Sequence, residues 1–292
     1  MTTADFTIDS LLPADMAARA EAVGIRKAHM DAVTIFVLSV LAGAFIALAA
    51  IYATTVWAGG SVLPYGVNRM LGGVVFCLGL VLVIMGGAEL FTGNNMIVMA
   101  WANRKISTSL VLRNWGIVFV GNFFGSVATA VIMLLTKQYT FGKGLVGLTA
   151  LNIASAKVAL DPLQAFFLGI MCNVLVCLAV WLCFGAHTTT DKIMAIIFPI
   201  SAFVAAGFEH SVANMYFIPI GLLIKQFAGP SFWAADALAK ADPVITAASF
   251  SKLTWTSFFV NNLVPVTLGN IVGGAVMVGL VYWFVYLRPK RA

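Results

Sequence analysis

Apolar residues run along this chain in long blocks rather than in a short alternating period. Six blocks stand out, at residues 34–56, 70–101, 110–136, 163–184, 193–227 and 257–286. A helix that crosses a membrane needs about 20 predominantly apolar residues, whereas half-buried helices and strands alternate apolar and polar positions with a short period. The pattern therefore predicts an all-α integral membrane protein with six transmembrane helices.

Composition agrees with this pattern and excludes most soluble classes. Apolar residues make up 61% of the 292 residues and charged residues 10%, against about 45–50% and about 25% in ordinary soluble domains. The net charge of +6 comes from Lys and Arg residues scattered over the predicted loops, not gathered into the stripe that nucleic-acid binding requires. We expect a single transmembrane transport domain, residues 1–292, whose surroundings are the lipid bilayer and which binds no nucleic acid.

Six spans place both termini on the same side of the membrane. Ten basic residues fall on that side and seven on the other. Cytoplasmic loops carry the excess of Lys and Arg in most membrane proteins. We therefore expect a multi-pass protein with both termini in the cytoplasm.

Residues 1–33 form a cytoplasmic amphipathic N-terminal segment in this interpretation. Residues 10–23 resemble a short helix, with Pro13 near its start and Leu12 and Met16 one turn apart. Such a helix lies along the membrane surface or caps a pore, or it is a solvated leader with no role in transport. Amphipathicity alone does not separate these alternatives.

The second and fifth spans are too long and carry polar residues in their middle. The second contains GGAELFTGNN at residues 86–95, and the fifth contains GFEHSVANM at residues 207–215. A polar group at mid-membrane costs several kcal/mol unless it is satisfied, and irregular backbone is tolerated there only beside protein or a cavity. We expect helices 2 and 5 to be broken and to enclose a solvated route.

The two halves of the chain echo one another. Both breaks contain a glycine two residues before a glutamate, followed by Asn-Met. In the third span Asn114 precedes Gly121-Asn122 by seven residues, and in the sixth Asn262 precedes Gly269-Asn270 by seven. The motifs GNFFG and GNIVG that begin there let helix backbones approach closely. Unless the matches arise by chance, they predict two inverted three-helix repeats with a solute site near the midplane.

Candidate chemistry gathers in the breaks. His210 is the only histidine inside a span, and an ionisable residue at that depth is a functional candidate, although a histidine in a packing seam is the alternative. Glu89 and Glu209 occupy matching positions; since a carboxylate in an anion path would repel the solute, we expect both to face protein and hold the loops. The chain has no HExxH motif and no Ser or Asp pair at active-site spacing, so we expect no catalytic residues, no metal and no cofactor.

Several stretches of the sequence are distinctive, namely SLLPADMAARAEAVGIRKA, MLGGVVFCLGL, GGAELFTG, NVLVCLAVW, FVAAGFEHSVANM with the following IPIG, and LVPVTLGNIVGG. In these stretches the chain resembles the formate/nitrite transporter family, and within it the formate channels of bacterial inner membranes. The stretches reach from near the N-terminus to the last span. The resemblance implies an aquaporin-like fold, a pore within each protomer and a homopentamer.

The resemblance also implies roles for individual residues. His210 and Thr92 match the central hydrogen-bonding pair of the pore. The matching constriction residues are Leu80, Leu90 and Phe91 on the cytoplasmic side and Phe76 and Phe203 on the periplasmic side. Further lining positions fall on Asn173, Val176 and Asn214, and basic residues that attract anions at the two mouths fall on Lys27 and Lys157.

The expected solute is formate, with possible proton coupling through His210. Formate has a pKa near that of an Asp side chain, about 3.9, so the anion dominates at neutral pH, yet crossing an apolar constriction favours the neutral acid. Gly93 after Thr92 gives LFTG, which looks more like the nitrite branch of the family. A nitrite or hydrosulfide channel is therefore the alternative, and a neutral-solute channel of the aquaporin type is the alternative of another class.

Overall fold

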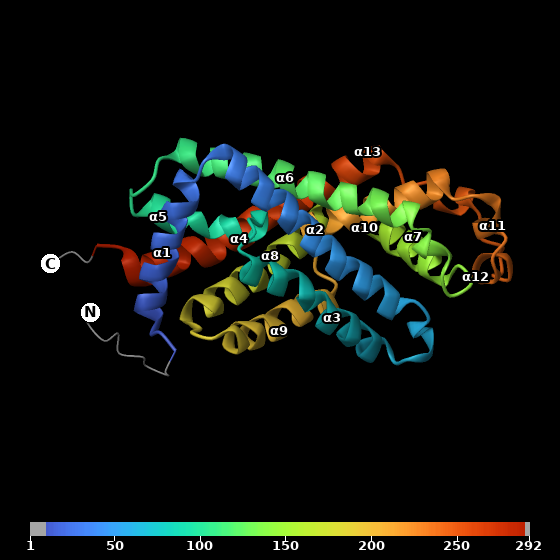
Figure 1. The fold of residues 1–292 in the computed structure, drawn as a ribbon, viewed down its shortest axis with the longest axis horizontal. Helices are drawn as coiled ribbons and strands as arrows, with labels where there is room; N and C mark the ends of the chain where they lie inside the picture. Colours follow the sequence, from blue (N-terminus) through green and yellow to red (C-terminus); the bar gives the residue numbers. More distant parts are fainter. Residues whose placement is uncertain (1–9, 290–292) are drawn as a thin grey trace.

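The computed structural model describes residues 10–289, which fold into helices joined by short loops (Figure 1). Six helical segments are long and apolar enough to cross a membrane. They are α2 (Ala32–Trp57), α3 (Tyr65–Gly86), α6 (Thr108–Leu135), α8 (Pro162–Gly185), α9 (Thr189–Ala206) and the composite segment Ala247–Leu287. The prediction of an all-helical protein with six apolar spans is confirmed.

The last span is built from consecutive short helical pieces. These are η4 (Ala247–Phe250), α13 (Trp255–Ser257), η5 (Phe258–Leu263), α14 (Val264–Ile271), η6 (Val272–Leu280) and η7 (Trp283–Leu287). Outside the spans lie α1 (Pro13–His29), η1 (Gly60–Val62), η3 (Gln138–Thr140), α7 (Leu145–Val158), α11 (Pro230–Trp233) and α12 (Asp236–Ala239).

The second and fifth spans are interrupted as predicted. Helix α3 stops at Gly86, and the chain resumes in α4 (Phe91–Asn94), η2 (Asn95–Ile97) and α5 (Val98–Ala102). Helix α9 stops at Ala206 and resumes in α10 (Ser211–Phe227). Gly87 and Gly207 end the two helices with φ of 69° and 78°, in the left-handed region that side chains with a Cβ rarely adopt.

Small residues bring neighbouring helices into backbone contact. A Cβ added to Gly125 of α6 would lie 2.0 Å from the carbonyl oxygen of Val40 in α2. A Cβ added to Gly269 of α14 would lie 2.1 Å from the carbonyl oxygen of Phe166 in α8. The GNFFG and GNIVG motifs therefore pack two equivalent helix pairs, as their small residues predict.

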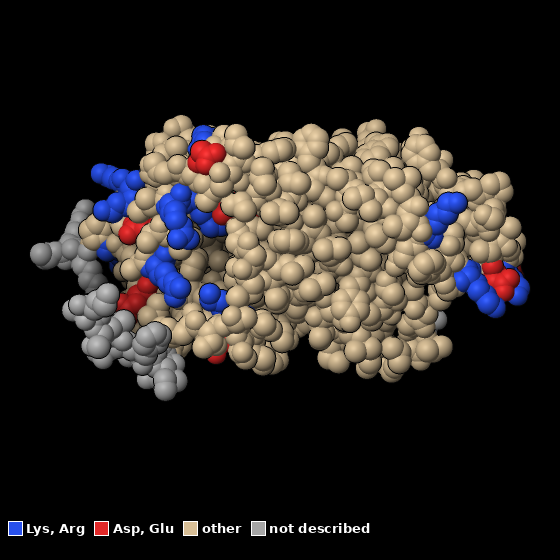
Figure 2. Space-filling view, in the orientation of Figure 1, with Lys and Arg blue, Asp and Glu red and all other residues tan. Residues whose placement is uncertain are grey.

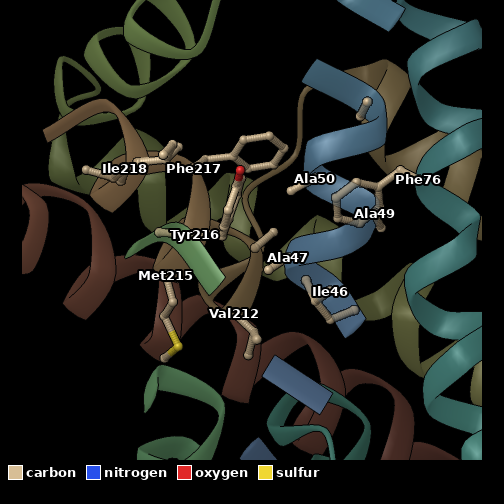
Figure 3. Packing of buried hydrophobic residues seen from close by; sticks show 14 of the residues in the cluster. Ile46, Ala47, Ala49, Ala50, Phe76, Val212, Met215, Tyr216, Phe217 and Ile218 are labelled. Atoms are coloured by element: carbon tan, nitrogen blue, oxygen red, sulfur yellow. The ribbon is translucent and has the colours of Figure 1, made fainter. Parts of the chain in front are cut away.

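Helix α10 runs through the centre of the protein. Every residue from Ser211 to Ile224 is buried, which is typical of a helix enclosed on all sides. Its Tyr216 and Phe217 lie against the alanines of α2 (Figure 3), and the ring of Phe217 stacks on that of Phe76 from α3, with centroids 6.2 Å apart. The small side chains on α2 leave room for these aromatic rings. The resulting contacts fix α10, the second half of the fifth span, against α2 and α3.

On the face shown in Figure 2, charged side chains gather at the two ends of the molecule, and the broad band between them shows no Lys, Arg, Asp or Glu. This distribution fits a protein whose middle faces lipid. Helix α1 lies at one end beside α5 (Figure 1) and buries Met16, Ala17, Ala20, Gly24 and Ala28. The helix is thus packed onto the membrane domain instead of standing free; residues 1–9 of the predicted N-terminal segment lie outside the described residues.

Candidate transport pathway

The two broken spans meet at a contact between His210 and Thr92. The Nε2 atom of His210 and the hydroxyl oxygen of Thr92 are 3.0 Å apart, and both residues are buried. His210 is the N-cap of α10, where its Nδ1 atom accepts a hydrogen bond of 3.0 Å from the backbone N–H of Ala213. Histidine caps this helix because the first amides of a helix lack partners of their own.

This cap determines which nitrogen of the imidazole carries a hydrogen. A neutral ring has one N–H and one acceptor nitrogen. Since Nδ1 of His210 accepts from Ala213, its Nε2 carries the hydrogen and donates to the Thr92 oxygen. The Thr92 hydroxyl hydrogen must then point elsewhere, so this group is left as a donor for a bound solute.

A wide cavity of about 420 Å³ ends at His210. Phe76 and Phe203, which also line it, meet edge to face with ring centroids 5.9 Å apart. The ring of Phe203 stacks on the imidazole of His210 at 5.8 Å. The two phenylalanines, predicted as a constriction, thus lie together directly beside the predicted central histidine.

A narrow cavity of about 50 Å³ lies on the other side of the breaks, beneath α1. Its lining includes Lys27 of α1, Leu80, Leu90 and Gly93. Thr92 is fully buried and lines neither cavity. Two cavities therefore approach the His210–Thr92 pair, and buried side chains separate them.

Each cavity is lined by a lysine that pairs with a buried carboxylate. Lys27 lies 3.0 Å from Glu89, and Lys157 lies 2.7 Å from Glu209. Ion pairing compensates each buried carboxylate, which would be strongly disfavoured alone. The two lysines predicted to attract anions therefore face an arriving solute as halves of ion pairs, not as isolated charges.

Two asparagines complete each carboxylate cluster in the same way. Asn94 donates to Glu89 at 2.7 Å and to Asn114 at 2.9 Å. In the other half, Asn214 donates to Glu209 and to Asn262, both at 2.7 Å. The two Lys-Glu-Asn-Asn clusters have matching contacts, and in them Asn94, not the Asn95 that the sequence echo aligned, corresponds to Asn214.

Comparison with known proteins agrees with this geometry. The sequence profile described as "Formate/nitrite transporter" matches residues 14–284. The chain belongs to the formate/nitrite transporter family. It is 41% identical to the formate channel FocA of Escherichia coli (strain K12), over 98% of both chains, and 39% identical to FocA of Haemophilus influenzae, over 93% of both.

Relatives and solved structures of the family extend the likeness. The chain is 39% identical to a protein named "Probable formate transporter" from Methanothermobacter thermautotrophicus, over 94% of this chain and 97% of that one. A solved "Pentameric formate channel with formate bound" superposes with a TM-score of 0.82 at 46% identity, covering 88% of this chain and 98% of that one. A solved "FNT family ion channel" gives 0.76 at 28% identity, covering 93% and 98%. These proteins are channels and transporters, and this chain is likewise a multi-pass membrane protein.

Another pair of asparagines, Asn122 and Asn270, satisfies the backbone at the two breaks. Asn122 accepts from the N–H of Phe91 at 2.9 Å and donates to the carbonyls of Ser39 and Glu89. Asn270 does the same in the other half: it accepts from Ser211 at 2.9 Å and donates to Gly169 and Glu209. The sequence indicated these positions only as parts of helix-packing motifs; their equal spacing from Asn114 and Asn262 was the signal of a shared role.

Three predicted pore residues line neither of these two cavities. The ring of Phe91 packs edge to face on Phe119, with centroids 5.1 Å apart, and lines neither cavity. Asn173 is fully buried and donates to the carbonyl oxygens of Thr92 and Asn270 and to the side chain of Asn95. Val176 is also buried away from both cavities. The constriction role of Phe91 and the lining roles of Asn173 and Val176 stay predictions.

Other predicted lining residues do lie on the cavities. Leu80 and Leu90 line the narrow cavity, and Asn214 lines the wide one. Sequence reasoning missed Trp57, Arg69 and Phe217, which also line the wide cavity. These three come from different helices and show no shared local pattern, so only the folded structure brings them together.

Proposed function

We propose that this protein carries formate across the bacterial inner membrane, each protomer of a homopentamer having its own pathway. The observation that carries the proposal is the buried His210–Thr92 pair at the meeting point of two cavities, with a threonine hydroxyl left free to donate. The names of the FocA relatives and the formate-bound pentamer with a TM-score of 0.82 support formate as the solute.

The chemistry of the pathway suits a small monovalent anion. A charged hydrogen-bond acceptor gains about 1.5–3 kcal/mol from a good donor, and the Thr92 hydroxyl offers such a donor where water is scarce. Apolar side chains on either side of it, Phe76 with Phe203 and Leu80 with Leu90, strip water from anything that passes. The pathway thus has one hydrogen-bond donor between two groups of apolar side chains. This arrangement favours a small solute with a single carboxylate over a larger solute or one with several charges.

Proton coupling through His210 makes a specific demand on this arrangement. A second proton on the ring has to go to Nδ1, and that atom accepts the Ala213 amide. Protonation of Nδ1 therefore breaks the hydrogen bond that caps α10. It also places the new N–H of His210 against the backbone N–H of Ala213. We propose that the neutral ring is the resting form. The ring passes its Nε2 proton through Thr92 to the solute only after another proton has reached Nδ1, so that it returns to the neutral form, and proton entry at Nδ1 requires the start of α10 to move.

We propose that the end of the molecule bearing α1 and the narrow cavity faces the cytoplasm. The basic side chains near α1 and at the start of α6 support this orientation, because cytoplasmic loops carry the excess of positive charge. The wide cavity with Lys157 then opens to the periplasm. Lys27 and Lys157 mark the two mouths, each held in place by its glutamate.

Solute flux into proteoliposomes tests the proposal. Purified protein is reconstituted, and the fluxes of formate, nitrite, hydrosulfide, acetate and glycerol are compared with those of empty liposomes and of the Thr92→Val variant. We expect formate to pass faster than acetate and glycerol, and Thr92→Val to lose most of this flux. Faster nitrite or hydrosulfide flux would assign the chain to those solutes, and glycerol flux that ignores the variant would favour a neutral-solute channel.

A further inference from the structure

Arg69 ties two spans together beside the wide cavity. It lies near the start of α3, and its Nη2 and Nε atoms donate to the carbonyl oxygens of Val204 and Ala205 at 2.6 and 3.3 Å. These carbonyls belong to the last turn of α9, just before the break at Gly207. The last carbonyls of a helix lack partners and carry its negative dipole end, so a cation is stabilising there.

The indole of Trp57 holds the guanidinium in place. The guanidinium carbon of Arg69 lies 5.0 Å from the centre of the Trp57 ring, within the range of a cation–π contact. The indole N–H donates to the carbonyl of Asn68 at 3.1 Å. A Cβ added to Gly72 would lie 2.0 Å from Nε1 of Trp57, so the ring lies directly against the backbone of α3. The stacked side chains form a rigid link between the end of α2, the start of α3 and the end of α9.

The link ends next to the constriction. Val204 directly follows Phe203, whose ring meets Phe76 edge to face and stacks on His210. Phe76 lies on α3, the helix that carries Arg69, so the link spans the two helices that bear the two rings. The distance between the phenylalanines therefore depends on how firmly Arg69 holds the last turn of α9.

We propose that Arg69, stacked on Trp57, is a positioning residue that sets the width of the Phe76–Phe203 constriction and thereby excludes anions larger than formate. The inference rests on the proposed anion transport and adds to it the residue that sets size selectivity. Arg69 also lines the wide cavity, where a cation attracts anions of any size. The geometry favours positioning, because two of its donor nitrogens are engaged by backbone carbonyls and its guanidinium carbon lies 5.0 Å from the centre of the Trp57 ring.

A measurement of size selectivity distinguishes a positioning role of Arg69 from simple attraction of anions by its charge. In proteoliposomes, the ratio of lactate flux to formate flux is measured for the wild type and for Arg69→Gln, Arg69→Lys and Trp57→Leu. We expect Arg69→Gln to raise the ratio by roughly tenfold, the effect of losing about one charge-assisted hydrogen bond. Arg69→Lys keeps the charge but not the fork of donors, so the ratio should rise by less. Trp57→Leu should shift it in the same direction without changing any charge.

Lys143→Gln is the matched control, because it removes a cation from the same end of the molecule on a side chain that is 81% exposed. It should leave the ratio unchanged. The proposal is overturned if Arg69→Gln lowers both fluxes equally while Arg69→Lys and Trp57→Leu keep the wild-type ratio. Absence of formate flux in the wild type would instead contradict the proposed function, so the two failures are distinguishable. Size-exclusion profiles identify variants that do not fold, and Trp57→Leu and Arg69→Lys still decide the question if Arg69→Gln is among them.

Discussion

Nε2 of His210 lies 3.0 Å from the hydroxyl oxygen of Thr92, although 118 residues separate them in the sequence. The contact joins the N-cap of α10 to the second residue of α4, so it depends on both breaks being in place. Because Nδ1 accepts from Ala213, the direction of this hydrogen bond is determined, and the hydroxyl hydrogen of Thr92 is left free to donate.

Replacing Thr92 by valine should remove this donor while keeping the shape of the side chain. A hydrogen bond to a charged group contributes about 1.5–3 kcal/mol, so formate flux in proteoliposomes should fall roughly ten- to a hundredfold. Thr92→Ser retains the hydroxyl and should keep most of the flux. Equal fluxes in the valine and serine variants would show that the hydroxyl does not contact the solute.

Removing one member of the Lys157–Glu209 pair should destabilise the protein more than removing both. A buried charge left without its partner costs about 3–5 kcal/mol, whereas a neutral replacement of the whole pair is often tolerated. Thermal unfolding in detergent should therefore show a larger loss of Tm for Lys157→Met than for the double variant Lys157→Met/Glu209→Gln. Additive effects of the two substitutions would mean that the 2.7 Å contact is not energetically coupled.

Two glycines of α6 should respond oppositely to alanine. Gly125 has no room for a methyl group, since a Cβ would lie 2.0 Å from the Val40 carbonyl, whereas Gly116 has nothing within 4 Å. Gly125→Ala should separate α2 from α6 and lower the Tm in detergent. Gly116→Ala should raise it slightly, by the equivalent of about 0.5–1 kcal/mol, because alanine favours the helix. A larger loss at Gly116 than at Gly125 would contradict the assigned packing.

Much of the fold could be predicted from local pattern because the membrane imposes simple rules. Runs of apolar residues long enough to span a bilayer identified the helices, and glycine beside Glu, His and Asn identified the two breaks. The inverted relation between the halves stays a prediction, although the Lys-Glu-Asn-Asn contacts occur in both. The resemblance to the family predicted that His210 lies beside Thr92. No local pattern in this chain contains that information.

The remaining details depend on contacts between distant segments. Phe91 follows a break, and its place in the sequence does not reveal its neighbours. Only the folded structure shows that its ring packs edge to face on Phe119 of α6. Lys27 and Lys157 looked like free cations because their partners lie 62 and 52 residues away along the chain. Arg69 gave no signal at all, since its partners are carbonyl oxygens, which every residue has.

Formate flux as a function of external pH, in the wild type and in His210→Asn, tests the central claim most directly. If the His210–Thr92 pair is the centre of the pathway, wild-type proteoliposomes should take up formate at a rate that changes with pH, and His210→Asn should alter both the rate and its pH dependence. Identical rates for the two proteins at every pH would show that the solute does not pass the imidazole.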